Sequence, residues 1–104
     1  MNERQQQEAE SLLGIAQRAG KVVSGDASLL QSLRRGEGVL LIVATDCGKN
    51  NRERYIHLAE REGMRKCSFS TKTRLGAALG KAQRAAVLVT DRGLAEAIIA
   101  KTNE

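Results

Sequence analysis

The residues that could perform catalysis lack the spacing that such chemistry requires. Gly48 and Lys49 resemble the end of a phosphate-binding loop, but Val43 stands where that motif needs its first glycine and Asn50 where it needs a hydroxyl. The single histidine, His57, has no neighbouring serine, cysteine or carboxylate pattern that would make it a general base. The sequence therefore predicts no catalytic residue and no enzyme activity.

The two cysteines do not form a recognisable site. Cys47 and Cys67 are isolated in the sequence and lack the paired C-x-x-C spacing of a zinc site. Two cysteines also make no disulfide framework, so a reducing cytoplasm is the expected compartment. We expect both to be small buried hydrophobic residues, and the sequence predicts neither a metal site nor a cofactor.

A segment from Lys21 to Gln31 has the residue types that bind a polyanion. A short strand turns at Gly25 into a helix, whose first backbone N–H groups have no partner within the helix and favour a phosphate or an electron-rich base edge. Ser28 and Gln31 add neutral hydrogen-bonding groups on one helix face. Asp26 would repel phosphate, so it is expected to cap the helix or to accept from a base amine. The alternative is an ordinary capped turn.

The second candidate segment lies in a stretch without acids. Between Glu62 and Asp91 the sequence contains only basic charges, which include Arg74 and the Lys81 to Arg84 turn after Gly80. Such a one-signed stretch creates a positive surface that suits nucleic acid. A solvated face with bound counterions would give the same pattern, so charge alone leaves both interpretations open.

Length and composition limit the class of protein. The chain has 104 residues, a formal net charge of +5 and 41% hydrophobic residues, which is typical of one folded domain over residues 1–104. No apolar run approaches the roughly 20 residues needed to cross a bilayer, and the first ten residues do not resemble a secretory signal. We therefore expect neither a membrane partner nor secretion.

Apolar spacing predicts an alternation of helices and strands. A first helix over about residues 7 to 19 would bury Leu12, Ile15, Ala16 and Ala19. The segments 39–44 and 86–90 are apolar at almost every position, as in parallel strands covered on both faces. The order α-β-α-β-α-β-α-β-α predicts an α/β fold, a single-domain three-layer α/β/α sandwich. In a parallel sheet the loops at one end converge, which would bring the two candidate segments side by side.

Together these segments resemble the kink-turn-binding ribosomal protein superfamily, and most closely its small bacterial YlxQ-like members. The resemblance covers about residues 11 to 100 and is carried by four motifs in order, which are 19–25, 39–46, 75–80 and 87–93. It implies a single α/β/α sandwich that binds a sharply bent internal loop of RNA through the start of the second helix and the loop after the fourth helix.

The resemblance transfers to this chain residue by residue. Gly25 matches the glycine of the family's helix-start signature and Ser28 is a weak equivalent of its polar residue, whereas Ala27 and Gln31 replace longer polar side chains. In the second loop Gly80 agrees with the family, and Lys81 and Arg84 keep the basic character of some members. Ala82 and Gln83 stand where many members have large apolar residues.

The sequence thus predicts a non-catalytic, monomeric, cytoplasmic protein that binds structured RNA, either kink-turn-like or ribosomal, in association with the ribosome. The alternative is a protein-interaction module that kept the fold and lost specific RNA recognition. The resemblance and the charge pattern together predict these RNA-binding residues: Lys21, Gly25, Asp26, Ala27, Ser28, Gln31, Arg74, Gly80, Lys81 and Arg84.

Overall fold

Within residues 1–102, which are those that the computed structural model describes, helices and strands alternate in the predicted order. Positions 103 and 104 of the predicted domain lie outside the described residues. The helices are α1 (Glu3–Arg18), α2 (Asp26–Arg34), α3 (Lys49–Arg61), α4 (Lys72–Leu79) and α5 (Arg92–Thr102). The strands are β1 (Val22–Ser24), β2 (Leu40–Val43), β3 (Arg65–Cys67) and β4 (Ala86–Val89).

The strands form one mixed sheet in the order β1-β4-β2-β3. β2 and β3 are parallel, but β4 runs antiparallel to both of its neighbours, so the prediction of a parallel sheet was wrong for β4. The cause is the connection through α4. The amide of Arg84 donates to the carbonyl of Lys72 at 3.1 Å, so the loop returns the chain to the start of α4. β4 therefore enters the sheet at the end where β3 has just left it.

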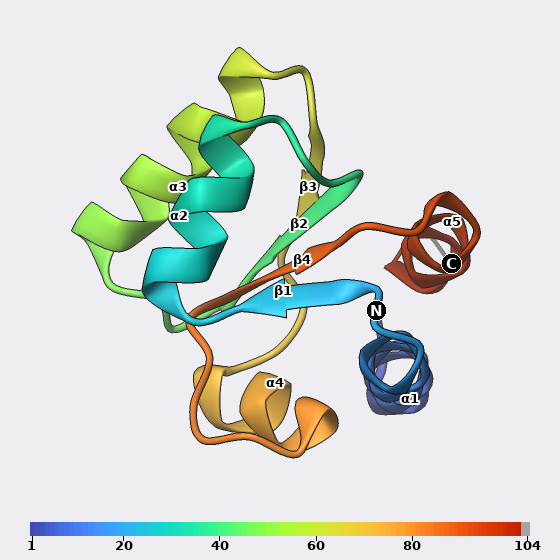
Figure 1. The fold of residues 1–104 in the computed structure, drawn as a ribbon. Helices are drawn as coiled ribbons and strands as arrows, with labels where there is room; N and C mark the ends of the chain where they lie inside the picture. Colours follow the sequence, from blue (N-terminus) through green and yellow to red (C-terminus); the bar gives the residue numbers. More distant parts are fainter. Residues whose placement is uncertain (103–104) are drawn as a thin grey trace.

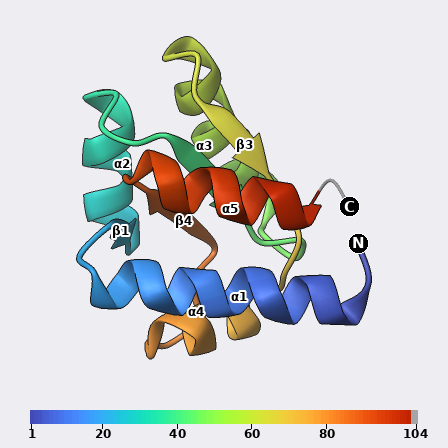
Figure 2. The ribbon, with the colours of Figure 1, turned by 90° about the vertical axis from the view of Figure 1, so that its right-hand side faces the viewer.

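Helices cover both faces of the sheet, which confirms the predicted three-layer arrangement. In Figure 1, α2 and α3 lie on one side, and α1 and α5 lie on the other, with α4 next to α1. Figure 2 shows α5 and α1 crossing the sheet side by side. Every residue of β2 and β4 is buried, as the two apolar segments predict. None of the helices within residues 1–102 is long and apolar enough to cross a membrane.

The first helix is longer than predicted and its buried face differs in part from the prediction. It begins at Glu3, where Asn2 and Gln5 cap it reciprocally, because the Asn2 side chain accepts from the Gln5 amide and the Gln5 side chain accepts from the Asn2 amide. Its buried side chains include Ala9, Leu13 and Ala16. Ala16 is buried and Leu12 packs, half-buried, against the core as predicted, whereas Ile15 is 45% exposed and Ala19 lies past the last turn.

Candidate nucleic-acid interface

The β1–α2 turn and the α4–β4 loop lie side by side at one end of the sheet. Ser24, the last residue of β1, is paired with Val87 of β4, so the turn after β1 adjoins the loop before β4. The guanidinium of Arg84 donates from Nε to the Ser24 hydroxyl at 3.1 Å. The two candidate segments therefore meet as the sequence predicts, although they meet through an antiparallel pair.

The start of α2 is held open by Gly25. This residue has a φ of 89°, a conformation that favours glycine, and no side chain caps the helix. The prediction that Asp26 caps α2 was wrong. Asp26 is already the first helical residue, and its carboxylate instead accepts from the Tyr55 hydroxyl at 2.5 Å and from Arg54 Nη2 at 3.1 Å. The first amides of α2 thus remain without a side-chain cap.

The neighbours of Asp26 compensate its charge. Arg54 forms an ion pair with Asp26, lies over the Tyr55 ring at 5.6 Å and also donates to the Asn51 side chain. Burial, together with the hydrogen bond to Asp26, raises the pKa of Tyr55 to about 12, so the phenol stays a donor at neutral pH. Sequence reasoning missed Arg54 and Asn51, which belong to no motif, and did not single out Tyr55 as part of the site. The carboxylate expected to repel RNA is therefore paired with a cation.

Gly76 determines where the α4–β4 loop lies. A Cβ on Gly76 would fall 2.1 Å from the carbonyl oxygen of Ala82, so the loop crosses α4 at a distance that only glycine allows. The amide of Lys81 donates to the carbonyl of Gly76 at 2.9 Å. Gly80 ends α4 in the left-handed conformation with a φ of 69°. As a result the exposed Lys81 side chain projects from an ordered turn.

Arg84 is fixed by three hydrogen bonds. Besides Ser24, its guanidinium donates from Nη1 to the carbonyl of Ala82 at 3.2 Å and to that of Gln83 at 3.0 Å. The side chain consequently has less conformational freedom to lose when it contacts an anion. Arg84 is thus a pre-positioned cation between the two candidate segments.

Two open hollows flank Arg84. The α2–α3 hollow, of about 330 Å³, is lined by Gly25, Asp26 and Arg84 together with residues of α3. The β1-edge hollow, of about 460 Å³, runs along β1, and Arg84 also contributes to its wall. The predicted residues that line one or both hollows are Gly25, Asp26, Ser28, Gln31, Lys81 and Arg84. We call these six residues the α2/α4–β4 interface.

The remaining predicted residues lie outside the two hollows. Ala27 is exposed at the start of α2, between residues that do line them, and Gly80 immediately precedes Lys81. Lys21 lies at the opposite end of β1 from Gly25, where its carbonyl accepts from the Thr90 amide at 2.9 Å. The structure therefore does not bring Lys21 together with the interface.

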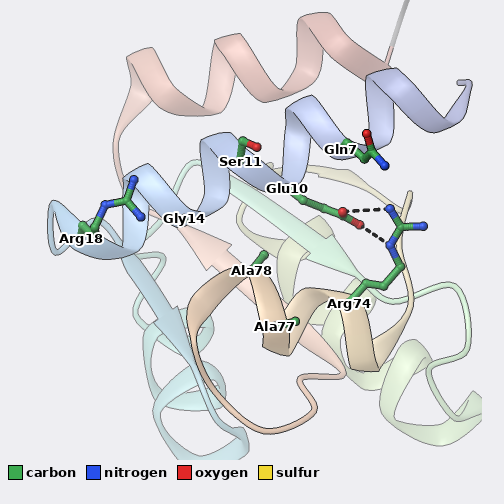
Figure 3. A pocket seen from close by; sticks show the side chains of 8 residues that line it. All are labelled: Gln7, Glu10, Ser11, Gly14, Arg18, Arg74, Ala77 and Ala78. Carbon is green, nitrogen blue, oxygen red and sulfur yellow. Dashed lines mark hydrogen bonds and ion pairs between the residues drawn. The ribbon is translucent and has the colours of Figure 1, made fainter.

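Arg74 does not join the interface either, but connects α4 to α1. Its guanidinium lies 2.7 Å from a Glu3 oxygen and 2.9 Å from a Glu10 oxygen, and Figure 3 shows the pairing with Glu10. The hydrogen bonds from Arg74 lower the pKa of Glu3, and the same bonds raise the pKa of Arg74. Glu10 also accepts from the Ser70 hydroxyl at 2.7 Å. The two acids are more than sixty positions away in the sequence, so no local pattern reveals this pairing.

We predict that Arg74→Met lowers the melting temperature at neutral pH, because Glu10 would lose its cation. The pKa of Glu3 is lowered in the folded state, so the stabilisation is complete above the ordinary carboxyl pKa and is lost as the pH falls through the lowered value. Thermal melts of both proteins across the acid range should therefore converge at low pH. A constant difference between them would contradict this explanation.

The other residues considered for chemistry lie apart from the interface or are inert. His57 is exposed on α3. Cys47 is buried and Cys67 is half-buried, and burial raises the pKa of both thiols, that of Cys67 to about 11. Protonated thiols are poor nucleophiles and poor metal ligands. Within residues 1–102 no three His, Cys, Asp or Glu side chains are grouped so that they could hold a metal ion.

Comparison with known proteins identifies the fold and its family. The sequence profile described as the Ribosomal protein L7Ae/L30e/S12e/Gadd45 family matches residues 7–99, which include both halves of the interface. The chain belongs to this family. Within the L7Ae/L30e/S12e/Gadd45 family it lies close to the YlxQ proteins, as the sequence resemblance predicts.

Individual relatives agree with this assignment. The chain is 31% identical over 88 residues to the RNA-binding protein YlxQ of Bacillus subtilis (strain 168), covering 85% of this chain and 88% of the relative. A solved structure of a protein with unknown function from Bacillus halodurans C has a TM-score of 0.86 at 25% identity and covers 92% of this chain and 97% of its own. The Giardia lamblia 15.5kD RNA binding protein shares the L7Ae-type fold with a TM-score of 0.74 at 19% identity, covering 99% of this chain and 88% of its own.

Proposed function

We propose that this protein is a non-catalytic RNA-binding protein that uses the α2/α4–β4 interface. The observation that supports this most directly is the contact between Arg84 and Ser24, which joins an uncapped helix start to a cationic turn. Helix N-terminal amides and arginine side chains both bind phosphate. Family membership and the RNA-binding name of the YlxQ relative support the same ligand.

We propose that the RNA is structured, with a kink-turn-like or ribosomal bend, and that the protein acts as a cytoplasmic monomer associated with the ribosome. The interface suits a bent strand because its two hollows lie on either side of Arg84 rather than in one straight groove. RNA that is folded back at a loop presents backbone to one hollow and unstacked bases to the other.

The balance between phosphate and base contacts is expected to differ from that of the wider family. Ala27 and Gln31 are shorter or uncharged where the family resemblance implies longer polar residues, and each base-edge contact is worth about 1–3 kcal/mol of discrimination. Lys81 and Arg84 contribute phosphate contacts that tolerate many sequences. We therefore propose that the protein prefers bent RNA but discriminates among bent RNAs weakly.

A titration with three RNAs tests this function. A kink-turn RNA, a straight duplex of equal length and a single strand are each titrated at two salt concentrations. We expect tightest binding to the kink-turn RNA, with an affinity that falls by about one log unit per log unit of salt for each phosphate neutralised. Equal affinity for all three RNAs would refute recognition of the bend, and absence of binding would refute the proposed function.

A further inference from the structure

A groove between α1 and α4 has no part in the interface described above. It encloses about 540 Å³ and is lined on the α1 side by Gln7, Ser11 and Arg18, and on the α4 side by Ala77 and Ala78. Figure 3 shows Arg18 at one end of the groove and the Arg74–Glu10 pair at the other. From Gln7 to Arg18 the groove therefore spans about three turns of α1, roughly 16 Å.

Small residues keep the floor of the groove low. A Cβ on Gly14 would lie 3.2 Å from the carbonyl oxygen of Ala78, so the two helices approach closely there. Ala77 and Ala78 have no long side chains that could fill the space from the α4 side. The polar backbone of a ligand can consequently enter the groove between the two helices. There it can contact the side-chain hydroxyl of Ser11 and the side-chain amide of Gln7 on α1.

Arg18 is a cation that has no ion-pair partner in the described part of the chain. Among residues 1–102 its guanidinium has neither an ion pair nor a side-chain hydrogen bond, and Nη1 lies 3.5 Å from the position of a Cβ on Gly14. It thus lies over the floor of the groove. Glu10 is the acid at the other end, and Arg74 neutralises it with hydrogen bonds from Nε and Nη2. The charged side chains that line the groove, Glu10, Arg18 and Arg74, sum to +1, and Glu3, which also pairs with Arg74, lies outside the lining, so the positive charge is concentrated at the Arg18 end.

The groove continues from the proposed RNA interface. Gln17 lines the β1-edge hollow, and the next residue, Arg18, lines the groove. The groove and the β1-edge hollow also adjoin at the end of α4. Ala78 lines the groove, and Lys81, three residues further along the chain, lines the β1-edge hollow. A strand that leaves Lys81 can follow the C-terminal ends of α1 and α4 into the groove.

We infer that the α1–α4 groove holds the phosphate backbone of one stem of the same RNA, beyond the bend bound at the α2/α4–β4 interface. This inference rests on the proposed function. Arg18 provides the charged contact, and Ser11 and Gln7 provide neutral hydrogen bonds to phosphate or ribose oxygens. The groove makes no contact with base edges, so it adds affinity for a long stem without adding sequence preference.

The test compares Arg18→Gln with the wild type on a bent-loop RNA with two full stems and on two RNAs in which one stem is cut back to the pairs next to the bend. We expect Arg18→Gln to weaken binding of the full RNA about fivefold to tenfold and to lower the salt slope by about one unit. The loss should disappear when one particular stem is removed. Arg61→Gln, at the exposed end of α3, is the matched control and should bind like the wild type.

Two results would overturn the inference. One is that Arg18→Gln binds every RNA as tightly as the wild type, and the other is that it loses affinity equally for all three RNAs. Lys81→Glu/Arg84→Glu is measured in parallel. If this variant loses all binding while Arg18→Gln keeps the RNA affinity of the wild type, the groove takes no part in RNA binding but the proposed function stands. If the wild type binds none of the RNAs, both are excluded.

A cleavage experiment identifies the stem directly. Ser11→Cys places an exposed thiol in the groove, whereas Cys47 is buried and Cys67 is half-buried. A hydroxyl-radical source attached at position 11 is expected to cut one strand of one stem in the complex. The same source on Glu53→Cys, on the exposed face of α3, should not cut there. Identical cleavage from both positions would contradict the inference.

Discussion

Lys81→Glu/Arg84→Glu is expected to lose roughly 100-fold or more in affinity for structured RNA at physiological salt, and the salt slope should fall by about two units. Both side chains line the β1-edge hollow, and Arg84 also lines the α2–α3 hollow, so the two reversals act on both halves of the interface. Each substitution removes a proposed phosphate contact and adds a repulsive charge. Titration of a kink-turn RNA at several salt concentrations measures both quantities.

The control is Arg61→Glu/Arg92→Glu, at the ends of α3 and α5 that lie away from Arg84. Each substitution of a basic residue by Glu subtracts two charges, so both double variants change the formal net charge from +5 to +1 (5 − 4 = 1). A global electrostatic effect would weaken both equally, and that result would contradict the interface. Because Arg84 also holds its loop, Lys81→Glu alone is measured as well, and it should lose about tenfold without a change in melting temperature.

Gly76→Ala is expected to destabilise the protein by about 1–3 kcal/mol and to weaken RNA binding in the folded fraction. The added methyl group would lie 2.1 Å from the carbonyl oxygen of Ala82, which is backbone and cannot rotate away. The loop must therefore move off α4, and it takes Lys81 and Arg84 with it. Urea denaturation gives the free energy of unfolding, and titration below the transition gives the affinity.

Gly48→Ala provides the matched control, because a Cβ at Gly48 would meet no atom within 4 Å and its φ is −60°. Because Gly48 is the N-cap of α3, where alanine is disfavoured, this variant should lose up to about 1 kcal/mol of stability but keep the affinity of the wild type. If Gly76→Ala behaves in the same way, the close crossing of the loop over α4 does not determine the geometry of the interface.

Much of the fold could be predicted because local chemistry specifies it. The apolar segments at 39–44 and 86–90 contain the two buried central strands β2 and β4. Thr71 caps α4 by accepting from the Arg74 amide, and Asp91 accepts from the Leu94 amide at the start of α5, as their residue types predict. These features depend on neighbours within a few positions, which a sequence displays directly.

Features that depend on distant neighbours were not predicted. The direction of β4 depends on the return of the chain from Arg84 to Lys72, which no periodicity records. Arg74 belongs to the basic stretch, yet it forms ion pairs with two glutamates of α1. Asp26 has the residue type of a helix cap, but its carboxylate instead accepts a hydrogen bond from the Tyr55 hydroxyl on α3.

The residues of the candidate site likewise include some that local sequence signals reveal and some that only distant contacts bring to the site. Gly25 and the Lys81 to Arg84 turn were identified because glycine and cation spacing are local signals, and the structure places them side by side. Asn51 and Arg54 line the α2–α3 hollow but carry no distinguishing pattern, since polar residues on an exposed helix are common. Only the packing of α3 beside α2 brings them to Gly25.

The position of β4 between β1 and β2 has a consequence for the order of folding. Ser24 and Arg84 are 60 positions apart, and β1 has no strand beside it until β4 inserts. A nascent chain that has not yet emerged past β4 therefore lacks a continuous sheet, and such long-range pairing forms slowly. Ser24 and Arg84, which join the two halves of the proposed interface, can therefore meet only after β4 has left the ribosome.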